Sequence, residues 1–207
     1  MTAVVRHHCK AALQRLFGLP QRRKVPLFGM TGRLVTQKGL DLILGARRLL
    51  SSGAQFVFLG TGEQRYEQAL VDLATAAPDQ IAVQLDFTDR LEHRLMAGAD
   101  IFLMPSLYEP CGLTQMRAQR YGSPPIVRNV GGLADTVEDG VTGFSFDAYT
   151  SGAFEEAGFR AVKCHGDTAK WQVMMRNGMA RDFSWERSVS AYLDVYRRAL
   201  ARSGSGR

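Results

Sequence analysis

The chain has no hydrophobic run long enough to cross a membrane. A spanning helix needs about 20 consecutive apolar residues, and no stretch of the 207 residues approaches that length. The first residues, MTAVVRHHCKAALQRLF, also lack the apolar core and the cleavage site of a secretory signal peptide. We therefore expect no membrane attachment and a cytoplasmic location.

Cysteine is scarce as well. The three cysteines, Cys9, Cys111 and Cys164, lie far apart and form no CxxC pair, which favours a reducing compartment. His7 and His8 precede Cys9, but adjacent side chains point apart and their spacing matches no zinc site. The sequence thus predicts neither a disulfide framework nor a metal site.

The rest of the composition is that of an ordinary globular protein with a basic surplus. Hydrophobic residues make up 45% of the chain and charged residues 22%, and the formal net charge is +6. A solvated basic surface explains this surplus, and so does an anionic partner. No recognition helix, zinc finger or aromatic RNA-binding pattern is present, so we expect a nucleotide diphosphate as the anion and not nucleic acid.

Apolar strands and helical segments alternate along the chain. Strands are expected at 25–31, 54–59, 81–87, 100–105, 125–130 and 144–146, and helices at 39–50, 64–76, 91–97, 112–121, 133–139 and beyond 146. Continuous apolar strands between helices are typical of a parallel sheet that is covered on both faces. The pattern predicts an α/β protein with a doubly wound, Rossmann-like parallel sheet.

The same pattern predicts how the chain is divided. Residues 1–24 are expected to form a linker or N-terminal extension, and residues 25–165 the Rossmann-like domain. Helices at 166–202 are expected to pack on that domain, and residues 203–207 to form a disordered tail.

The loop after the first predicted strand carries two cations. In a doubly wound sheet, ligands bind beyond the carboxyl ends of the strands, where the strand order reverses. This loop reads GRLVTQKG from 32 to 39 and contains Arg33 and Lys38. A guanidinium fork, an ammonium point charge and a helix start together suit a diphosphate. A basic surface loop that turns at Gly39 explains the same residues equally well.

The loop after the fourth predicted strand carries a carboxylate. Glu109 stands just before a helix start, where it could accept hydrogen bonds from sugar hydroxyls. Alternatively, it is simply an acidic residue that the helix dipole stabilises at the helix start. The amides of Gly112, Leu113 and Thr114 would point at a phosphate. Cys111 is expected to line a pocket or pack in the core, since no basic residue adjoins it in sequence to activate its thiol.

Two further signals follow strands. Gly60 and Gly62 flank Thr61 in a GxG segment, which is either a phosphate-binding loop or a strand-to-helix turn. Phe87 ends the third predicted strand, where its ring could stack on a base or pack in the core.

Several of these segments occur together in a fixed order. GRL at 32–34 is followed by QKGLDL at 37–42, and Pro105-Ser106 is followed by EPCGLTQ at 109–115. YGSPPIV at 121–127, GGLADTV at 131–137, NGM at 177–179 and DFSW at 182–185 complete the set. Together they resemble the signatures of bacterial glycogen synthases and plant starch synthases, over about residues 10–200.

The resemblance implies a fold and a reaction. The fold would be the C-terminal, nucleotide-sugar-binding half of a two-domain GT-B glycosyltransferase. The reaction would move glucose from ADP-glucose to the non-reducing end of an α-1,4-glucan with retention of configuration. ADP-glucose and ADP would be substrate and product, with no separate cofactor and no metal. In a plant-type system the resemblance would imply a plastid location.

The resemblance also implies roles for individual residues. It places Arg33 and Lys38 on the distal phosphate of the donor and Glu109 on the transferred glucose, as the catalytic set. The residues expected around the nucleotide sugar are Gly60, Gly62, Phe87, Cys111, Gly112, Leu113 and Thr114. Phe87 would lie under adenine, at a position that the family usually gives to Tyr. Arg117 stands where many other retaining GT-B enzymes carry a second glutamate for the ribose.

Finally, the resemblance implies a partner domain. Family members carry an N-terminal domain with a Lys-x-Gly-Gly-Leu loop and most of the acceptor groove, and nothing in this sequence resembles it. We therefore expect a fragment, a split subunit or an isolated domain. Three interpretations stay open: a catalytic half that is active with its partner, a truncated nucleotide-binding module, and a basic interaction protein built on a Rossmann scaffold.

Overall fold

The computed structural model describes residues 3–204, and one parallel sheet organises them. The six strands of the sheet lie in the order β3-β2-β1-β4-β5-β6. They are β1 (Leu27–Thr31), β2 (Gln55–Leu59), β3 (Ile81–Gln84), β4 (Ile101–Met104), β5 (Pro125–Arg128) and β6 (Phe144–Phe146). Every pairing is parallel. The predicted doubly wound α/β fold is therefore confirmed.

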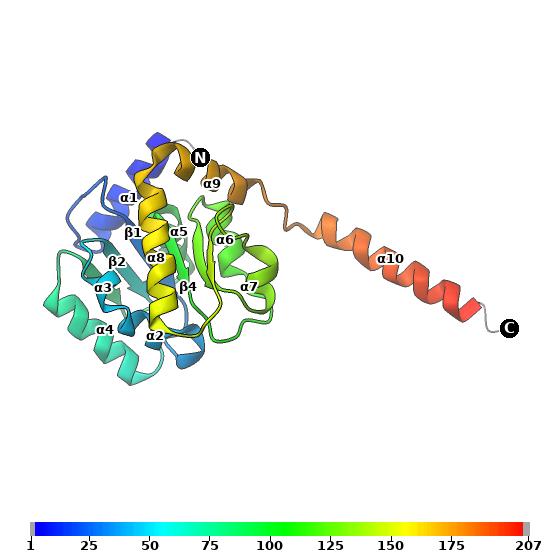
Figure 1. Ribbon diagram of the computed structural model, residues 1–207, viewed down its shortest axis with the longest axis horizontal. Coiled ribbons are helices and arrows are strands. Elements are labelled where there is room, and N and C mark those ends of the chain that lie inside the picture. The colour runs from blue at the N-terminus through cyan, green and yellow to red at the C-terminus, as the bar shows by residue number, and fades with distance from the viewer. Residues whose placement is uncertain (1–2, 205–207) are drawn as a thin grey trace.

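Helices cover both faces of the sheet (Figure 1). One face carries α2 (Leu40–Gly45), α3 (Arg47–Leu50), α4 (Gln64–Ala76), α8 (Ser151–Gly166) and α9 (Thr168–Ala180). The other carries α1 (Ala3–Leu16), α5 (Asp89–Gly98), α6 (Thr114–Arg120) and α7 (Gly131–Thr136). Within residues 3–204, no helix is long and apolar enough to cross a membrane.

Strand side chains alternate between the two cores. On β2, Phe56 and Phe58 point into the core under α2, α4 and α8, while Val57 and Leu59 point into the core under α1 and α5. Burial of each large apolar side chain of this kind stabilises the folded state by roughly 1.5–3 kcal/mol. Because both faces are buried, the strands read as continuous apolar runs, and this is why they could be located from the sequence.

The helix predicted at 39–50 is broken into α2 and α3. Ala46 leaves the helical region, with φ −81° and ψ 57°. Gly45, which ends α2, lies so close to α8 that a Cβ there would be 2.2 Å from Oγ of Ser151. The break lets the chain pass the start of α8, a contact between distant segments that local periodicity does not reveal.

Residues 1–24, predicted as a linker or N-terminal extension, contain α1, which packs against α5. The face of α1 that turns inward carries Arg6, Lys10, Leu13 and Gln14, all buried. The polar residues recur at every fourth position and lie on one helix face. The helix was missed because an inward face that is mostly polar does not produce an apolar stripe.

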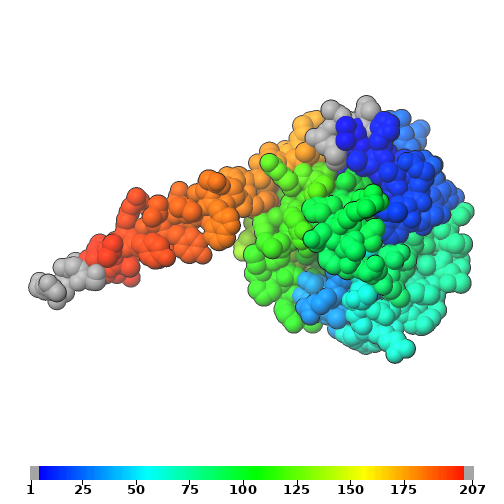
Figure 2. Space-filling model, turned by 180° about the vertical axis from the view of Figure 1, so that it is seen from behind, coloured from blue at the N-terminus to red at the C-terminus, as the bar shows by residue number. Residues whose placement is uncertain are grey.

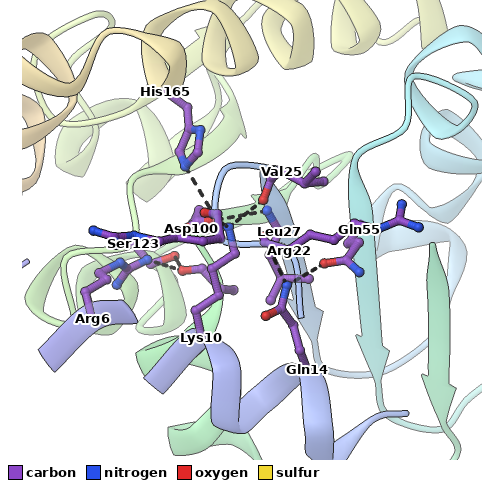
Figure 3. A network of polar contacts seen from close by, with 12 residues as sticks. Arg6, Lys10, Gln14, Arg22, Val25, Leu27, Gln55, Asp100, Ser123 and His165 are labelled. Atoms are coloured by element: carbon purple, nitrogen blue, oxygen red, sulfur yellow. Dashed lines mark hydrogen bonds and ion pairs between the residues drawn. The ribbon is translucent and has the colours of Figure 1, made fainter. Parts of the chain in front are cut away.

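These polar side chains enter a buried network at the amino ends of the strands (Figure 3). Nζ of Lys10 lies 2.5 Å from Oδ2 of Asp100 and also donates to the backbone oxygens of Arg23 and Val25. Asp100 further accepts the amide of Leu27 at 3.0 Å. Nε2 of His165, at the end of α8, lies 3.5 Å from the same carboxylate oxygen. The network ties α1, the segment before β1 and α8 to one edge of the sheet.

The two C-terminal helices differ in whether they pack on the domain. α9 packs on the domain through buried Trp171 and Met174, as predicted for 166–202. The next helix, α10 (Trp185–Gly204), projects away from the domain (Figures 1 and 2), and Trp185 is 75% exposed. The prediction that this helix packs on the same domain is therefore wrong for this structure.

The apolar residues of α10 recur at helical spacing and none of them is buried. This apolar face consists of Trp185, Val189, Tyr192, Leu193, Tyr196 and Leu200. The spacing predicts an amphipathic helix but does not say which surface its apolar face contacts. Of the predicted tail at 203–207, residues 203 and 204 end α10, and residues 205–207 lie outside the described residues.

Candidate functional site

The strand order reverses between β1 and β4, which are neighbours in the sheet. The loops that follow these two strands therefore lie side by side at the carboxyl edge. The amide of Leu107 donates to the carbonyl of Gln37 at 2.9 Å. Gly39 has φ +77°, and a Cβ there would be 2.1 Å from the carbonyl oxygen of Pro105. Only glycine allows the two loops to approach so closely.

This packing joins Lys38 to Glu109. Nζ of Lys38 lies 2.6 Å from Oε2 of Glu109, although the residues are 71 positions apart. Their side chains are 23% and 12% exposed, so the ion pair is shielded but can still be reached from solvent. The sequence located both residues, but it did not predict that each would neutralise the other.

Arg33 lies at the start of the same loop as Lys38. Its side chain is exposed and makes no hydrogen bond or ion pair within residues 3–204. A guanidinium without a partner on this loop is free to bind an anion. The structure thus brings Lys38 and Glu109 together and leaves Arg33 exposed on the loop that carries Lys38.

A cavity of about 130 Å³ lies under these loops. Its lining residues are Met30, Thr31, Gly32, Lys38, Phe87, Glu92, Leu103, Met104, Ser106 and Thr114. The hydroxyls of Thr31 and Ser106 are buried and have no hydrogen-bond partner in the described part of the chain. Buried hydroxyls are nearly always paired. Two residues with unpaired hydroxyls therefore line the same cavity, as expected beside a site for a polar ligand.

Phe87 was expected to end the third strand, but it lies beyond the end of that strand. β3 stops at Gln84, and Phe87 lies in the following loop, 46% exposed, with its side chain lining the cavity. Packing of Phe87 in the core is therefore ruled out, and stacking on a ligand remains open to it.

Gly60 and Gly62 allow two backbone segments of the site to approach each other closely. Gly60 has φ +146°, and a Cβ there would be 1.9 Å from the carbonyl oxygen of Gly32. A Cβ at Gly62 would be 2.2 Å from the carbonyl oxygen of Leu34. Neither glycine lines the cavity. They allow the loop after β2 to support the loop that carries Arg33 and Lys38.

The loop at 109–114 is held from two sides. The start of α7 packs on it, since the amide of Gly132 donates to the carbonyl of Glu109 at 3.0 Å. Nε2 of Gln115 donates to the carbonyls of Cys111 and Gly112 at 3.0 and 2.9 Å. Glycine is required at position 112, where φ is +72°.

The predicted residues of this loop are not equally close to the cavity. Cys111 and Leu113 are exposed, and Thr114 lines the cavity. The amides of Gly112 and Leu113 donate no hydrogen bond within residues 3–204. These two donors can therefore serve an anionic ligand.

Thr31, Ser106 and Glu92 also belong to the site, although the sequence did not indicate them. Glu92, in the first turn of α5, is buried and lines the cavity. Its Oε2 accepts a hydrogen bond from Nη1 of Arg117 at 2.9 Å. A carboxylate soon after the third strand was a signal that could have drawn attention to Glu92. The hydroxyls of Thr31 and Ser106 give no signal until the strand ends are placed in space.

The sheet topology defines a Rossmann-like domain, with a cavity and the Lys38–Glu109 pair at the edge where the strand order reverses. Residues 16–172 match the family model for glycosyl transferases group 1, and the chain belongs to this family. The solved structures that it resembles are GT-B glycosyltransferases, as the sequence predicted.

Three similar proteins illustrate the likeness. Glycogen synthase 2 of Nitrosococcus oceani is 47% identical over 95% of this chain, and a glycogen synthase of Anaeromyxobacter sp. (strain Fw109-5) is 51% identical over 93%. The catalytic domain of starch synthase IV from Arabidopsis thaliana, solved with ADP and acarbose, is 35% identical over 95% of the chain, with a TM-score of 0.86. The chain spans 42%, 42% and 43% of these proteins' own lengths.

Proposed function

We propose that this chain is the donor-binding half of a retaining glucosyltransferase. It moves glucose from ADP-glucose to the non-reducing end of an α-1,4-glucan, together with a domain that carries the acceptor groove. The observation that carries the proposal is the Lys38–Glu109 pair, which lies beside a polar cavity at the switch point of the sheet. The similar proteins named as glycogen synthases, and the starch synthase solved with ADP and acarbose, support it.

Lys38 and Arg33 act on the diphosphate. When the bond between C1 of glucose and the diphosphate breaks, negative charge grows on the leaving oxygen. Lys38 then moves part of its interaction from Glu109 to the phosphate, while exposed Arg33 supplies a second cation. Fixed positive groups stabilise this charge more in the transition state than in the ground state, and losing one such contact typically slows a reaction by about 10²–10³-fold.

Glu109 acts on the sugar. Its carboxylate accepts hydrogen bonds from glucose hydroxyls and balances the positive charge that develops on the ring. The free amides of Gly112 and Leu113 lie in the same loop and bind the anionic end of the donor. Because Glu109 is engaged with Lys38, it is not a free nucleophile, and retention then arises by attack of the acceptor on the same face of the sugar.

The exposed ring of Phe87 stacks under adenine at the edge of the cavity. We place the reaction in the cytoplasm, and we propose no nucleic acid among its partners. The acceptor glucan and the partner domain lie on the side of the carboxyl edge, where Tyr108 and Leu113 are exposed.

Calorimetric titration of this chain with ADP-glucose and UDP-glucose tests the proposal. ADP-glucose should bind more tightly than UDP-glucose. Arg33→Ala and Lys38→Ala should each weaken ADP-glucose binding by about 10–100-fold, since a hydrogen bond to a charged group contributes roughly 1.5–3 kcal/mol.

Lys163→Ala is a matched control, because Lys163 is an exposed lysine near the end of α8, close to the amino edge of the sheet. This variant should bind ADP-glucose as the unmodified chain does. Unchanged affinity in both site variants would overturn the phosphate assignment, and binding of RNA in place of nucleotide would favour the interaction-protein interpretation.

A further inference from the structure

Glu92 is the only carboxylate among the described residues that line the cavity. Its side chain is only 5% exposed, so the charge is largely removed from bulk water. A buried carboxylate is unfavourable unless it is paired and hydrogen-bonded. A buried acid in the wall of a ligand cavity therefore requires an explanation beyond surface solubility.

Arg117 explains how the buried charge of Glu92 is paired. Its Nη1 lies 2.9 Å from Oε2 of Glu92, which joins α6 to α5 and neutralises the buried charge. The second carboxylate oxygen, Oε1, makes no hydrogen bond within residues 3–204. Arg117 thus fixes the carboxylate through one oxygen and leaves the other as an acceptor.

The other cavity residues indicate what this acceptor would receive. Phe87, five residues before Glu92, and Lys38 also line the cavity. Phe87 has an aromatic ring, and Lys38 has an ammonium group. A nucleoside diphosphate presents an aromatic base, a ribose with two hydroxyls and a diphosphate, in that order. A ring and a cation in one small cavity account for the two ends of this molecule, and the ribose hydroxyls between them require an acceptor.

We propose that Oε1 of Glu92 accepts a hydrogen bond from a ribose hydroxyl of the bound nucleotide. Arg117 is the positioning residue, since its hydrogen bond to Oε2 orients the carboxylate. This inference rests on the proposed function, because it presumes that the cavity takes a nucleoside diphosphate.

A cycle of variants and nucleotides tests the inference. ADP, 2′-deoxy-ADP and 3′-deoxy-ADP are titrated by calorimetry into the unmodified chain and into Glu92→Ala. One deoxy nucleotide should bind the unmodified chain about 10–100-fold more weakly than ADP, as expected for a lost hydrogen bond to a charged group. Glu92→Ala should bind ADP with a similar loss and should then not discriminate between ADP and that deoxy nucleotide.

The outcomes separate this inference from the proposed function. If the unmodified chain binds no ADP, the proposed function fails. If ADP binds but the deoxy penalty is absent, or is equal in Glu92→Ala and the unmodified chain, only the ribose assignment is overturned. Should Glu92→Ala not fold, Glu92→Gln keeps the shape, and its deoxy penalty should fall to about 2–10-fold, as for a neutral hydrogen bond.

Two more variants distinguish positioning from packing. Arg117→Ala should lower the deoxy penalty, and Arg117→Lys should restore part of it. Glu155→Ala is the matched control, because Glu155 is also shielded and lies near an arginine, with Nη1 of Arg48 at 3.6 Å, but it does not line the cavity. This control should keep the full deoxy penalty, and an equal penalty in Arg117→Ala would mean that Arg117 only joins two helices.

Discussion

Two lysine–carboxylate pairs of nearly equal length lie at opposite edges of the sheet. At the amino edge, Lys10 and Asp100 are 2.5 Å apart and are 2% and 7% exposed. At the carboxyl edge, Lys38 and Glu109 are 2.6 Å apart and are 23% and 12% exposed. The chemical groups are the same, so the difference between the pairs lies in what surrounds them.

The amino-edge pair is almost fully satisfied. Lys10 donates to two backbone oxygens, and Asp100 accepts a backbone amide and faces His165. The carboxyl-edge pair lies near two buried hydroxyls and two amides that have no hydrogen-bond partner among residues 3–204. We infer that a saturated buried pair fixes the fold, whereas a shielded pair with unused donors and acceptors nearby is suited to bind a ligand.

The largest expected effect comes from breaking the amino-edge pair. Lys10→Met leaves the buried charge of Asp100 unpaired and should lower the free energy of unfolding by roughly 3–5 kcal/mol. Urea denaturation followed by circular dichroism measures this loss in the free energy of unfolding. The double variant Lys10→Met, Asp100→Leu should recover part of the loss, and a loss under 1 kcal/mol in the single variant would contradict a structural role for the pair.

The pH dependence of stability should come largely from the same edge. Burial alone would raise the pKa of Asp100, but the hydrogen bond from His165 and the positive charge of Lys10 outweigh burial and hold this pKa well below its usual range. The unfolded chain then binds more protons in acid, so the contribution of Asp100 is present above about pH 4 and is lost as the pH falls.

Urea denaturation at a series of pH values between about 5 and 3 checks this sign. Stability should fall with decreasing pH, and the fall should be shallower in Asp100→Asn. An equally steep fall in that variant would assign the acid sensitivity to other carboxylates.

A smaller loss is expected from the support of the carboxyl-edge site. Gly60→Ala places a Cβ against the carbonyl oxygen of Gly32 at a φ of +146°, and should lower the free energy of unfolding by roughly 1–3 kcal/mol. Gly152→Ala is the control, because a Cβ there meets nothing within 4 Å. Equal stability of the two variants would mean that the loop after β2 adjusts freely.

The carboxyl-edge pair itself should contribute little to stability. Lys38→Met should change the free energy of unfolding by about 1 kcal/mol or less, because a solvent-accessible pair gains little on folding. The same variant should lose nucleotide affinity, as Lys38→Ala does. A loss in stability as large as that of Lys10→Met would remove the contrast between the two edges.

The smallest effect should come from removing α10. Deleting residues 185–207 should change the free energy of unfolding by less than about 0.5 kcal/mol, since the apolar face of α10 is not buried on the domain. Deleting residues 168–207 also removes buried Trp171 and Met174 and should be strongly destabilising. A large loss from the shorter deletion would mean that α10 packs on the domain in solution.

The strands of the sheet and the two site loops were predictable from the sequence. Buried parallel strands are apolar on both faces, so β1 to β6 stand out as short runs, and the loops after β1 and β4 carry recognisable charged residues. The end of β3 was placed too late because Leu85 and Phe87 continue the apolar run after the pairing stops. Sequence alone also did not reveal α1, whose inward face is polar.

By itself, the sequence determined the order of the strands, the fold class and the positions of Arg33, Lys38 and Glu109, because hydrophobic periodicity and turn residues act over a few neighbours. Only the tertiary structure decided which charges pair. Lys10 meets Asp100, Glu92 meets Arg117 and Lys38 meets Glu109 across 90, 25 and 71 positions. Such contacts depend on strand order and helix packing, which bring distant segments together and are not encoded in any local pattern.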